Sequence, residues 1–322
     1  MTRPTVTVLM LSYNKEPFIG AALESLGRQT YRDIEFIVID DCSVDGSLRI
    51  VEEWCDMQKF PCRLIRHRVN QGVCRSLNEA IGMARGQYLA FHGSDDLWHP
   101  DFLERFVGHM SQLADEVAVL YGDAEVIDER GASLSSSFID MWRQFDRPPE
   151  GKIFYELLKG NFIPAMAVLC RIESIRSVGG YDESLWYEDW DMWLRLAERY
   201  EFALAPSQLA KYRVVATSMT QSADWESCRT SSQMAIRLKW LGRDARSDAI
   251  LEKSLGLPWT AERLYAAGHP RARRYAVAWF WREPRARSLA VAIGAASRLP
   301  YPVFQRVSAV ALAARRRIRH EV

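Results

Sequence analysis

Apolar runs and amphipathic stretches alternate along the first 120 residues of the chain. Each run is short, rich in β-branched or other apolar residues, and ends in polar or acidic residues, a pattern typical of strands that are buried on both faces. Between the runs, apolar residues recur at helical spacing, as at Ile19, Leu23 and Leu26. The pattern predicts strands at 5–11, 34–41, 63–65, 88–91 and 117–121.

Helices are predicted to connect these strands through short links. They begin near Pro17 and Ser47 and cover 73–84 and 100–114. Strands that alternate with helices in this way favour right-handed crossovers and a mainly parallel sheet flanked by helices, so the chain is predicted to have an α/β fold. Neither a GxGxxG nor a GxxxxGK(S/T) motif follows a strand, which argues against a dinucleotide-binding Rossmann site and against a P-loop.

The second half of the chain departs from this alternation. Residues 122–165 are loop-rich, and 165–170 predict one more strand. Apolar residues spaced at i, i+3, i+4 and i+7 from Trp190 predict an amphipathic helix. From about residue 222 the sequence is rich in Arg, Ala and Trp and predicts helical hairpins interrupted at Pro284.

A last basic helix is predicted over 302–319, which completes a helical C-terminal extension. We therefore expect two domains, an α/β domain at 1–221 and an Arg-rich extension at 222–322. The net charge of +1 hides a contrast between them. Residues 271–322 contain twelve Arg and no Lys against two Glu, a local charge of +10, so the remainder carries −9.

Composition places the chain among globular proteins, with 48% apolar and 26% charged residues. The six cysteines are scattered without the spacing of a zinc site, which favours reduced thiols and a cytoplasmic location. The N-terminus leads directly into the first strand, and no apolar run reaches the roughly 18 residues of a membrane span. Neither a signal peptide nor a transmembrane segment is predicted.

Two adjacent carboxylates, Asp95 and Asp96, follow the predicted strand at 88–91. Open α/β sheets bind ligands at the carboxyl ends of their strands. Two carboxylates without Cys or His at ligand spacing suit a hard divalent cation, Mg²⁺ or Mn²⁺, which commonly bridges to phosphate oxygens. The alternative is a polar loop in which one of the two caps the next helix.

A second group of acids, Glu188, Asp189 and Asp191, lies beside Trp186 and Tyr187. An apolar, aromatic setting can raise the pKa of a carboxylate toward the range of a general base. The alternative is that these acids only complement the dipole at the start of the predicted helix.

Several motifs, in order and spacing, resemble the family 2 inverting glycosyltransferases with the GT-A fold, of the kind that build bacterial surface polysaccharides. The resemblance covers about residues 5–220. Each motif is weak by itself, but the series is specific. The motifs are Leu11–Asn14, Gln29–Thr30, Ile39–Ser47, Asn70–Gly72, Asn78, Ala84–Gly86, Gly93–Asp96, Gly179–Asp182, Glu188–Asp189 and Tyr212–Arg213.

The resemblance implies a nucleotide-diphosphate sugar as donor, with UDP as the nucleotide, and a glycan or lipid-linked saccharide as acceptor. It implies that Asp95, with Asp96 beside it, binds Mn²⁺ or Mg²⁺. It also implies that Asp189 is the general base and that Glu188 supports it. The residues implied for nucleotide binding are Leu11, Tyr13, Glu16, Asp41, Arg75, Ser94 and Arg213.

The sequence departs from the family pattern in three places. Many members have Asp where this chain has Gly93, Arg where it has Leu77, and His shortly after the Tyr-Arg pair, where Val214 and Val215 follow. The Gln-x-x-Arg-Trp signature of processive synthases is also absent, which favours transfer of a single sugar. Two other functions stay open, a non-catalytic binding protein on the same fold and a sugar nucleotidyltransferase.

The Arg-rich extension allows two interpretations. Its arginines can be a solvated surface of packed helical hairpins. Basic residues together with aromatic residues such as Trp279 and Trp281 also suit the surface of an anionic membrane, where a lipid-linked acceptor lies. The acidic remainder of the chain argues against a nucleic-acid partner.

Overall fold

The computed structural model describes residues 5–142, 145–185, 188–215, 225–255, 262, 265, 272–282, 285–297 and 300–305. The chain forms two compact units, Met1–Lys239 and Trp240–Val322. The predicted boundary after residue 221 lies outside the described residues.

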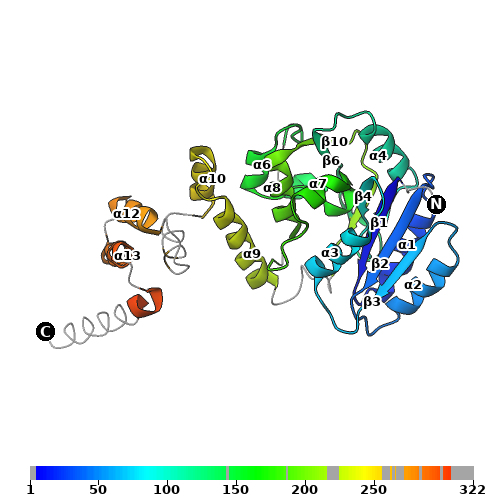
Figure 1. Cartoon of the computed structure of the whole chain (residues 1–322), viewed down its shortest axis with the longest axis horizontal. Helices are drawn as coiled ribbons and strands as arrows, with labels where there is room; N and C mark the ends of the chain where they lie inside the picture. The colour runs from blue at the N-terminus through cyan, green and yellow to red at the C-terminus, as the bar shows by residue number, and fades with distance from the viewer. Residues whose placement is uncertain are drawn as a thin grey trace. The chain divides into compact units, whose positions relative to one another are not determined.

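A seven-stranded sheet forms the centre of the first unit (Figure 1). Four neighbouring strands run parallel in the order β4-β1-β2-β3. Their bounds agree with the predicted strands to within one residue: β1 (Val6–Ser12), β2 (Ile34–Asp40), β3 (Cys62–Arg66) and β4 (Tyr88–Phe91). Seven consecutive residues of β2 are buried, which explains its continuous apolar pattern.

Beyond β4 the sheet is mixed. β9 (Val168–Arg171) runs antiparallel between β4 and β6 (Val117–Tyr121), and β10 (Glu201–Leu204) pairs in parallel with β6. The predicted strand at 165–170 begins three residues later, because a 3-10 turn, η1 (Ala165–Ala167), occupies its start. The prediction of a mainly parallel sheet flanked by helices is confirmed.

Helices cover both faces of the sheet. On one face, Val6 and Val8 of β1 form a core with Ile19, Leu23 and Leu26, all of them fully buried. In Figure 1, α1 and α2 lie on this side of β1 and β2, whereas α3 lies on the other. Their bounds are α1 (Glu16–Gly27), α2 (Ser47–Asp56), α3 (Val73–Met83) and, after β4, α4 (Phe102–Met110).

A second sheet was not predicted from the sequence. It has the order β5-β11-β7-β8. Its strands are two to four residues long, too short to show a period: β5 (Leu97–Trp98), β7 (Ala124–Ile127), β8 (Ser133–Ser135) and β11 (Ala210–Arg213). The region described as loop-rich also contains two short helices, α5 (Phe138–Trp142) and α6 (Phe154–Lys159).

The predicted amphipathic helix is α8 (Glu188–Arg199), preceded by α7 (Ile172–Ser177). The side chains of Trp190 and Trp193 are among the largest that are fully buried, and the Trp190 indole N–H donates to the carbonyl of Leu157 in α6 at 2.7 Å. Burial of two indoles fixes the start of α8, where two of the candidate acids lie.

The second unit is helical in the part of the chain that the structure describes. It contains α10 (Ala245–Leu255) and the packed pair α12 (Ala272–Arg282) and α13 (Ala286–Ala296). The helix before it, α9 (Trp225–Trp240), ends at the boundary between the units. Pro284 and most of the predicted last helix lie outside the described residues.

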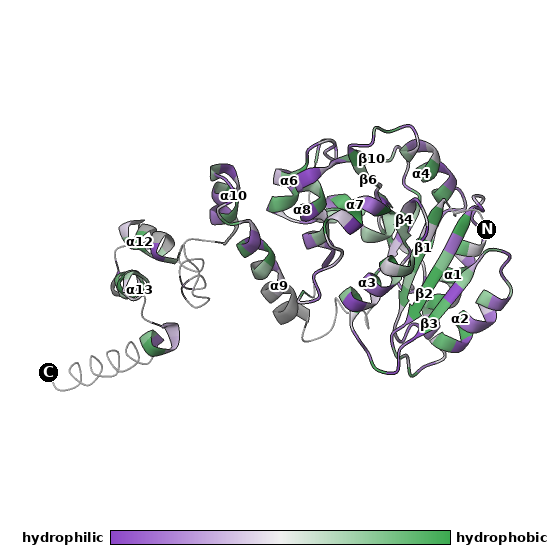
Figure 2. Ribbon diagram, in the orientation of Figure 1, coloured by the Kyte–Doolittle hydropathy of each residue, from purple (hydrophilic) through white to green (hydrophobic). Residues whose placement is uncertain are grey.

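Figure 2 shows that hydrophobic residues concentrate in the central strands, most clearly in β1. No helix among the described residues has both the length and the hydrophobicity that a membrane crossing requires.

Candidate active site

The loops that follow β1, β2 and β4 meet at one edge of the central sheet. These strands are parallel neighbours, with Leu9 of β1 opposite Phe91 of β4 and Ser12 opposite Asp40 of β2. Their carboxyl ends therefore lie side by side. The three loops carry Tyr13, Asp41 and Asp95, so the fold brings together three of the residues that the sequence predicted for one site.

The loops after β1 and β2 hold each other in place. Asn14 Oδ1 accepts the main-chain N–H of Val44 at 2.9 Å, with Asn14 itself in the left-handed region (φ 52°). Glu16 Oε2 accepts the N–H of Gly46 at 2.8 Å, and Asp45 accepts the N–H of Glu16 at 3.0 Å. Glu16 thus has a clear role in shaping the loops, and its contact with a nucleotide stays a prediction.

Asp41 is buried and organises the turn that precedes α3. Its two carboxylate oxygens accept the main-chain N–H groups of Gln71 and Gly72 at 2.8 and 2.9 Å. Gly72 has φ 85°, a conformation that favours glycine. These bonds fix the carboxylate at the edge, and the role of Asp41 in nucleotide binding stays a prediction.

His67 was missed by the sequence analysis. It is the residue after β3, and its ring nitrogens lie 2.7 Å from Asp41 Oδ1 and 2.9 Å from Glu79 Oε2. Burial opposes protonation of His67, but the hydrogen bonds and charges of the two carboxylates outweigh it and raise its pKa. No local sequence pattern marks His67, because its partners Asp41 and Glu79 are 26 and 12 residues away in the chain.

The paired carboxylates after β4 have different surroundings. Asp95 is partly exposed and forms an ion pair with Lys15, with 2.5 Å between Oδ2 and Nζ. Asp96 is buried, and its Oδ1 accepts the N–H of Arg213 at 2.9 Å. Burial and the neighbouring charge of Asp95 raise the pKa of Asp96. Of the two, Asp95 is therefore the one better placed to meet a cation from solvent.

Gly93 leaves the space that Asp96 uses. A Cβ atom at residue 93 would lie 2.1 Å from Asp96 Oδ2 and 2.8 Å from its Cγ, so the Asp96 side chain would have to move. Many family members have Asp at this position, and here Gly93 leaves the space that the buried Asp96 carboxylate occupies.

The donor set at this edge is small. Among the residues that the structure describes, no group of three or more His, Cys, Asp and Glu could hold a metal ion. Asp95 can supply one carboxylate ligand. This fits Mg²⁺ or Mn²⁺ only as ions that take their other ligands from water and from a bound diphosphate, as Mg²⁺ commonly does.

Arg213 is 7% exposed and is bound to the main chain around the carboxylates. Its Nε donates to the carbonyl of Asp95 at 2.8 Å, and its Nη1 donates to the carbonyls of Asp128 and Glu129 at 3.0 Å. The guanidinium lies 5.6 Å from the ring centroid of Phe18. These contacts fix the loop that carries Asp95, and the role of Arg213 in nucleotide binding stays a prediction.

Glu188 and Asp189 form a half-buried pair in the first turn of α8. Asp189 Oδ2 accepts a hydrogen bond from the side-chain amide of Asn161 at 3.0 Å. Burial raises the pKa of Asp189 to about 6, and burial together with the charge of Asp189 raises the pKa of Glu188 to about 8. Trp186 and Tyr187, the aromatic residues from which a raised pKa was expected, lie outside the described residues. The pair can hold one proton while keeping one base.

The third acid of this group, Asp191, is held in ion pairs. Asp191 is fully buried, with Arg195 Nε at 2.7 Å and Lys239 Nζ at 2.8 Å. Lys239 also contacts Asp182 at 2.5 Å. This network joins α8 to the end of α9 and leaves the first two acids as the candidates for chemistry.

A family model for glycosyl transferase family 2 matches residues 7–175, which is more than half of the chain. The chain belongs to glycosyl transferase family 2. An uncharacterised glycosyltransferase of Haemophilus influenzae is 28% identical over 217 residues. That match covers 66% of this chain and 66% of the relative, so the chain spans just under two thirds of the relative's length.

Solved structures confirm the GT-A fold of this family 2 protein. Residues 1–349 of TarS from S. aureus, in complex with UDP-GlcNAc, have a TM-score of 0.60 at 19% identity, over 90% of this chain and 79% of that one. The mannosyltransferase PcManGT of Pyrobaculum calidifontis, in complex with GDP-Man and Mn²⁺, has a TM-score of 0.57 at 20% identity, over 98% and 86%.

Two family motifs without an assigned role explain how this protein positions the acidic pair. The side chain of Asn78 in α3 bonds to both main-chain groups of Tyr181, at 2.9 Å from the carbonyl and 2.7 Å from the N–H. The Tyr181 ring packs edge-on against Phe91 at the end of β4, with 6.1 Å between centroids. Tyr181 thus joins the segment that precedes α8 to α3 and to the end of β4.

The remaining predicted nucleotide contacts differ in exposure. Tyr13 is 46% exposed and Ser94 is buried. Leu11 is partly buried in β1, and Arg75 in α3 is an exposed side chain 3.5 Å from Glu183. None of these positions conflicts with the predicted role, and none tests it.

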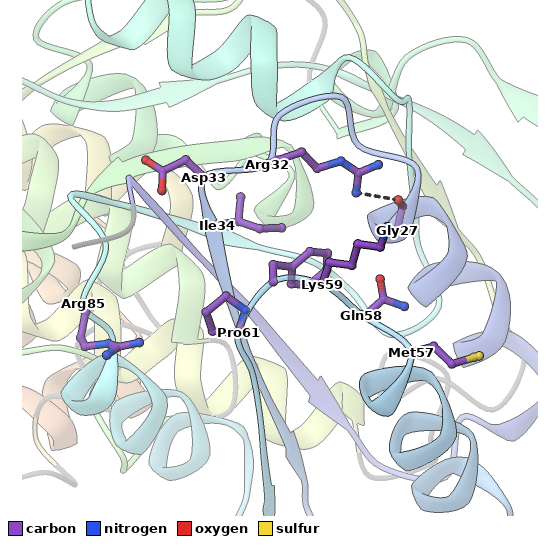
Figure 3. A pocket seen from close by; sticks show the side chains of 10 residues that line it. Gly27, Arg32, Asp33, Ile34, Met57, Gln58, Lys59, Pro61 and Arg85 are labelled. Atoms are coloured by element: carbon purple, nitrogen blue, oxygen red, sulfur yellow. Dashed lines mark hydrogen bonds between the residues drawn. The ribbon is translucent and has the colours of Figure 1, made fainter. Parts of the chain in front are cut away.

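The described pocket lies at the opposite edge of the sheet (Figure 3). It has a volume of about 760 Å³ and is lined where β2 and β3 begin, by Ile34, Lys59 and Pro61 among others. No candidate acid lines it. The candidate nucleotide and metal residues Tyr13, Asp41 and Asp95 lie instead at the carboxyl edge, where the loops converge.

Proposed function

We propose that this protein is an inverting glycosyltransferase that moves one sugar from a nucleotide-diphosphate sugar to a hydroxyl of a glycan or lipid-linked saccharide. The observation that carries the proposal is Asp189, a half-buried carboxylate with a raised pKa, in a protein that also presents Asp95 at the ends of its parallel strands. One acid suits proton removal from an acceptor, and the other suits a cation at the donor. A glycosidase that hydrolyses its substrate with two flanking carboxylates would not need a cation site such as the one proposed at Asp95.

Asp189 would take the proton from the acceptor hydroxyl as its oxygen forms a bond to the anomeric carbon. The bond from that carbon to the diphosphate oxygen breaks on the opposite side, which inverts the configuration. Asn161 holds Asp189 Oδ2 and orients the carboxylate. Glu188, protonated at neutral pH because of its raised pKa, would limit the negative charge beside the base.

Asp95 would hold a divalent cation together with the diphosphate. Such an ion, when bound, neutralises the charge that develops on the leaving group. TarS in complex with UDP-GlcNAc and PcManGT in complex with GDP-Man and Mn²⁺ have the same fold and support a nucleotide sugar and a cation here. We propose UDP as the donor nucleotide and keep GDP as the alternative in each test.

The test is release of free nucleotide diphosphate from a panel of UDP- and GDP-sugars, with and without Mn²⁺ and saccharide acceptors. Acceptor-dependent release that needs the metal supports transfer. Binding of a nucleotide without release from any donor would favour a non-catalytic protein, and pyrophosphate chemistry would favour a nucleotidyltransferase.

For the second unit we propose contact with an anionic membrane surface on the cytoplasmic side, where a lipid-linked acceptor would lie. Trp281, Leu289, Ile293 and Val303 are large apolar side chains that are 42–77% exposed in this unit. They occur in the stretch with a charge of +10. Exposed apolar and basic side chains together bind anionic lipid, with about 1 kcal/mol for each basic residue.

Co-sedimentation with liposomes tests this contact, using phosphatidylglycerol-containing and neutral vesicles at low and high salt. Salt-sensitive binding to the anionic vesicles is expected, and a Trp281→Ser, Ile293→Ser variant should lose most of it. Equal and negligible binding to both vesicles would mean that the arginines are only a solvated surface.

A further inference from the structure

Lys15 is a cation that no sequence motif assigned to the site. It lies in the loop after β1, and its Nζ donates to Asp95 Oδ2 at 2.5 Å. The two side chains are 18% and 17% exposed, so the pair is shielded from most of the solvent. The main-chain N–H of Lys15 is fixed by Ser47 Oγ at 2.7 Å. The two loops thus place an ammonium group on the carboxylate that the proposed function gives to the divalent cation.

The ammonium group and a divalent cation compete for this oxygen. Each needs direct contact with it, at about 2.7–2.9 Å for the ammonium and about 2.1 Å for the metal, and their like charges repel. Asp96 cannot take over as the partner of either cation, because its Oδ1 accepts the N–H of Arg213 and its side chain is buried. Lys15 therefore has to leave Asp95 Oδ2 when a metal binds there.

A bound diphosphate would give Lys15 a new partner at the same place. The lysine side chain is a flexible stem with a point charge, so it can turn while its main chain stays fixed. Arg213, another cation at this edge, already donates to three main-chain carbonyls and is 7% exposed. The ammonium of Lys15 is consequently better placed than this guanidinium to meet a phosphate oxygen.

We propose that Lys15 is a donor-site cation that exchanges partners, pairing with Asp95 in the protein without donor and with the diphosphate once a divalent cation occupies Asp95. The inference rests on the proposed function, because it requires a diphosphate donor and a metal at Asp95. It assigns Lys15 two effects of opposite sign. The residue weakens the binding of metal alone and strengthens the binding of metal together with nucleotide diphosphate.

The test compares Lys15→Met with Lys59→Met in the full-length protein. Lys59 is an exposed lysine near the start of β3, in the pocket at the opposite edge, and serves as the matched control. Electron paramagnetic resonance measures Mn²⁺ binding without nucleotide, and calorimetry measures UDP and GDP binding at saturating Mn²⁺. Lys15→Met should bind Mn²⁺ alone several-fold more tightly and bind the nucleotide diphosphate about tenfold more weakly, through loss of one charge-assisted contact. Lys59→Met should change neither.

A second variant, Lys15→Arg, keeps the charge and should retain nucleotide affinity to within about threefold of wild type. Weaker Mn²⁺ binding by Lys15→Met would show that the lysine only holds Asp95 in place, and unchanged nucleotide affinity would show that it does not meet the diphosphate. Either result overturns the inference.

The Asp95→Ala variant separates this failure from failure of the proposed function. If Asp95→Ala weakens nucleotide binding in Mn²⁺ and Lys15→Met does not, only the inference is wrong. If Asp95→Ala has no effect, or wild type binds neither nucleotide, the proposed donor site itself is wrong.

Discussion

Replacing Asp189 with Asn removes the proposed base and keeps the shape of the side chain. Loss of a general base costs about 10²–10⁴ in rate, which corresponds to about 2.7–5.4 kcal/mol in the activation free energy. We therefore expect kcat of Asp189→Asn to fall by this factor in an assay of nucleotide diphosphate release. Affinity for the nucleotide should stay within about threefold, because Asp189 lies on α8 and not in the loops that would bind the donor.

The stability of this variant can be worked out from its hydrogen bonds. Asp189 accepts from the Asn161 amide and from the N–H of Trp190, whereas an Asn side chain has only one acceptor oxygen. Asn161 cannot simply turn its amide, because its Oδ1 accepts the N–H of Ile163 at 3.1 Å. One bond is lost, which costs about 1 kcal/mol of unfolding free energy and leaves the protein folded.

The pH profile provides the decisive control for Asp189. Because burial raises its pKa to about 6, wild-type activity should fall as the pH drops through about 6 and the base becomes protonated. This acid limb should be missing from the residual activity of Asp189→Asn. Asp191→Asn is the matched control on the same helix. It should lower the free energy of unfolding by weakening the contacts with Arg195 and Lys239, and it should have little effect on kcat. A fully active Asp189→Asn, or an unchanged acid limb, would refute the assignment.

Three further predictions concern the same edge of the sheet and the same acidic pair. Asp95→Ala should lose Mn²⁺-stimulated nucleotide binding, measured by calorimetry, with its melting temperature nearly unchanged; full stimulation would contradict the metal assignment. Gly93→Ala should destabilise the protein by about 1–3 kcal/mol in urea unfolding, because the new Cβ displaces Asp96 from the N–H of Arg213; wild-type stability would show that the loop has spare room. Glu188→Gln should raise the melting temperature at pH 8 by about 2–4 °C for each kcal/mol gained and have little effect at pH 5; a decrease at pH 8 would exclude a raised pKa.

The sign of the Glu188 prediction follows from proton linkage. Its folded-state pKa is raised above the value in the unfolded chain, so folding favours the protonated form. This contribution to stability is present at low pH and is lost as the pH rises toward 8. Gln mimics the protonated carboxyl at every pH, and its benefit therefore grows as the pH rises from about 4.5 to about 8.

Four strands of the central sheet, β1, β2, β4 and β6, could be predicted from the sequence because nearly all of their residues are buried and apolar runs mark them. β4 and β6 begin and end at the predicted residues, and β1 and β2 differ by one residue. The antiparallel direction of β9 and the presence of a second sheet could not be predicted in this way. Their short strands have no period of their own and exist through pairing with distant segments, as β11 does with β5 and β7.

The residues of the candidate site also divide into those that sequence motifs revealed and those that only the structure revealed. Asp95, Asp41 and the acidic pair of α8 follow recognisable motifs, and the fold places the first two at the expected edge. Lys15 and His67 were not found, because each owes its position to a partner on another strand's loop, Asp95 and Asp41 respectively. The separation of Asp191 from the other acids depends on Arg195 and Lys239 and could not be read from spacing alone.

Proton NMR of a reaction mixture tests most directly whether the protein transfers a sugar with inversion. Wild-type protein is incubated with Mn²⁺, a UDP- or GDP-sugar that it binds, and a saccharide acceptor, while the anomeric proton of the transferred sugar is followed. We expect a new glycoside whose anomeric configuration is opposite to that of the donor, and no product with Asp189→Asn over the same period. A product that retains the donor's configuration, or no glycoside with any donor that the protein binds, would contradict this expectation.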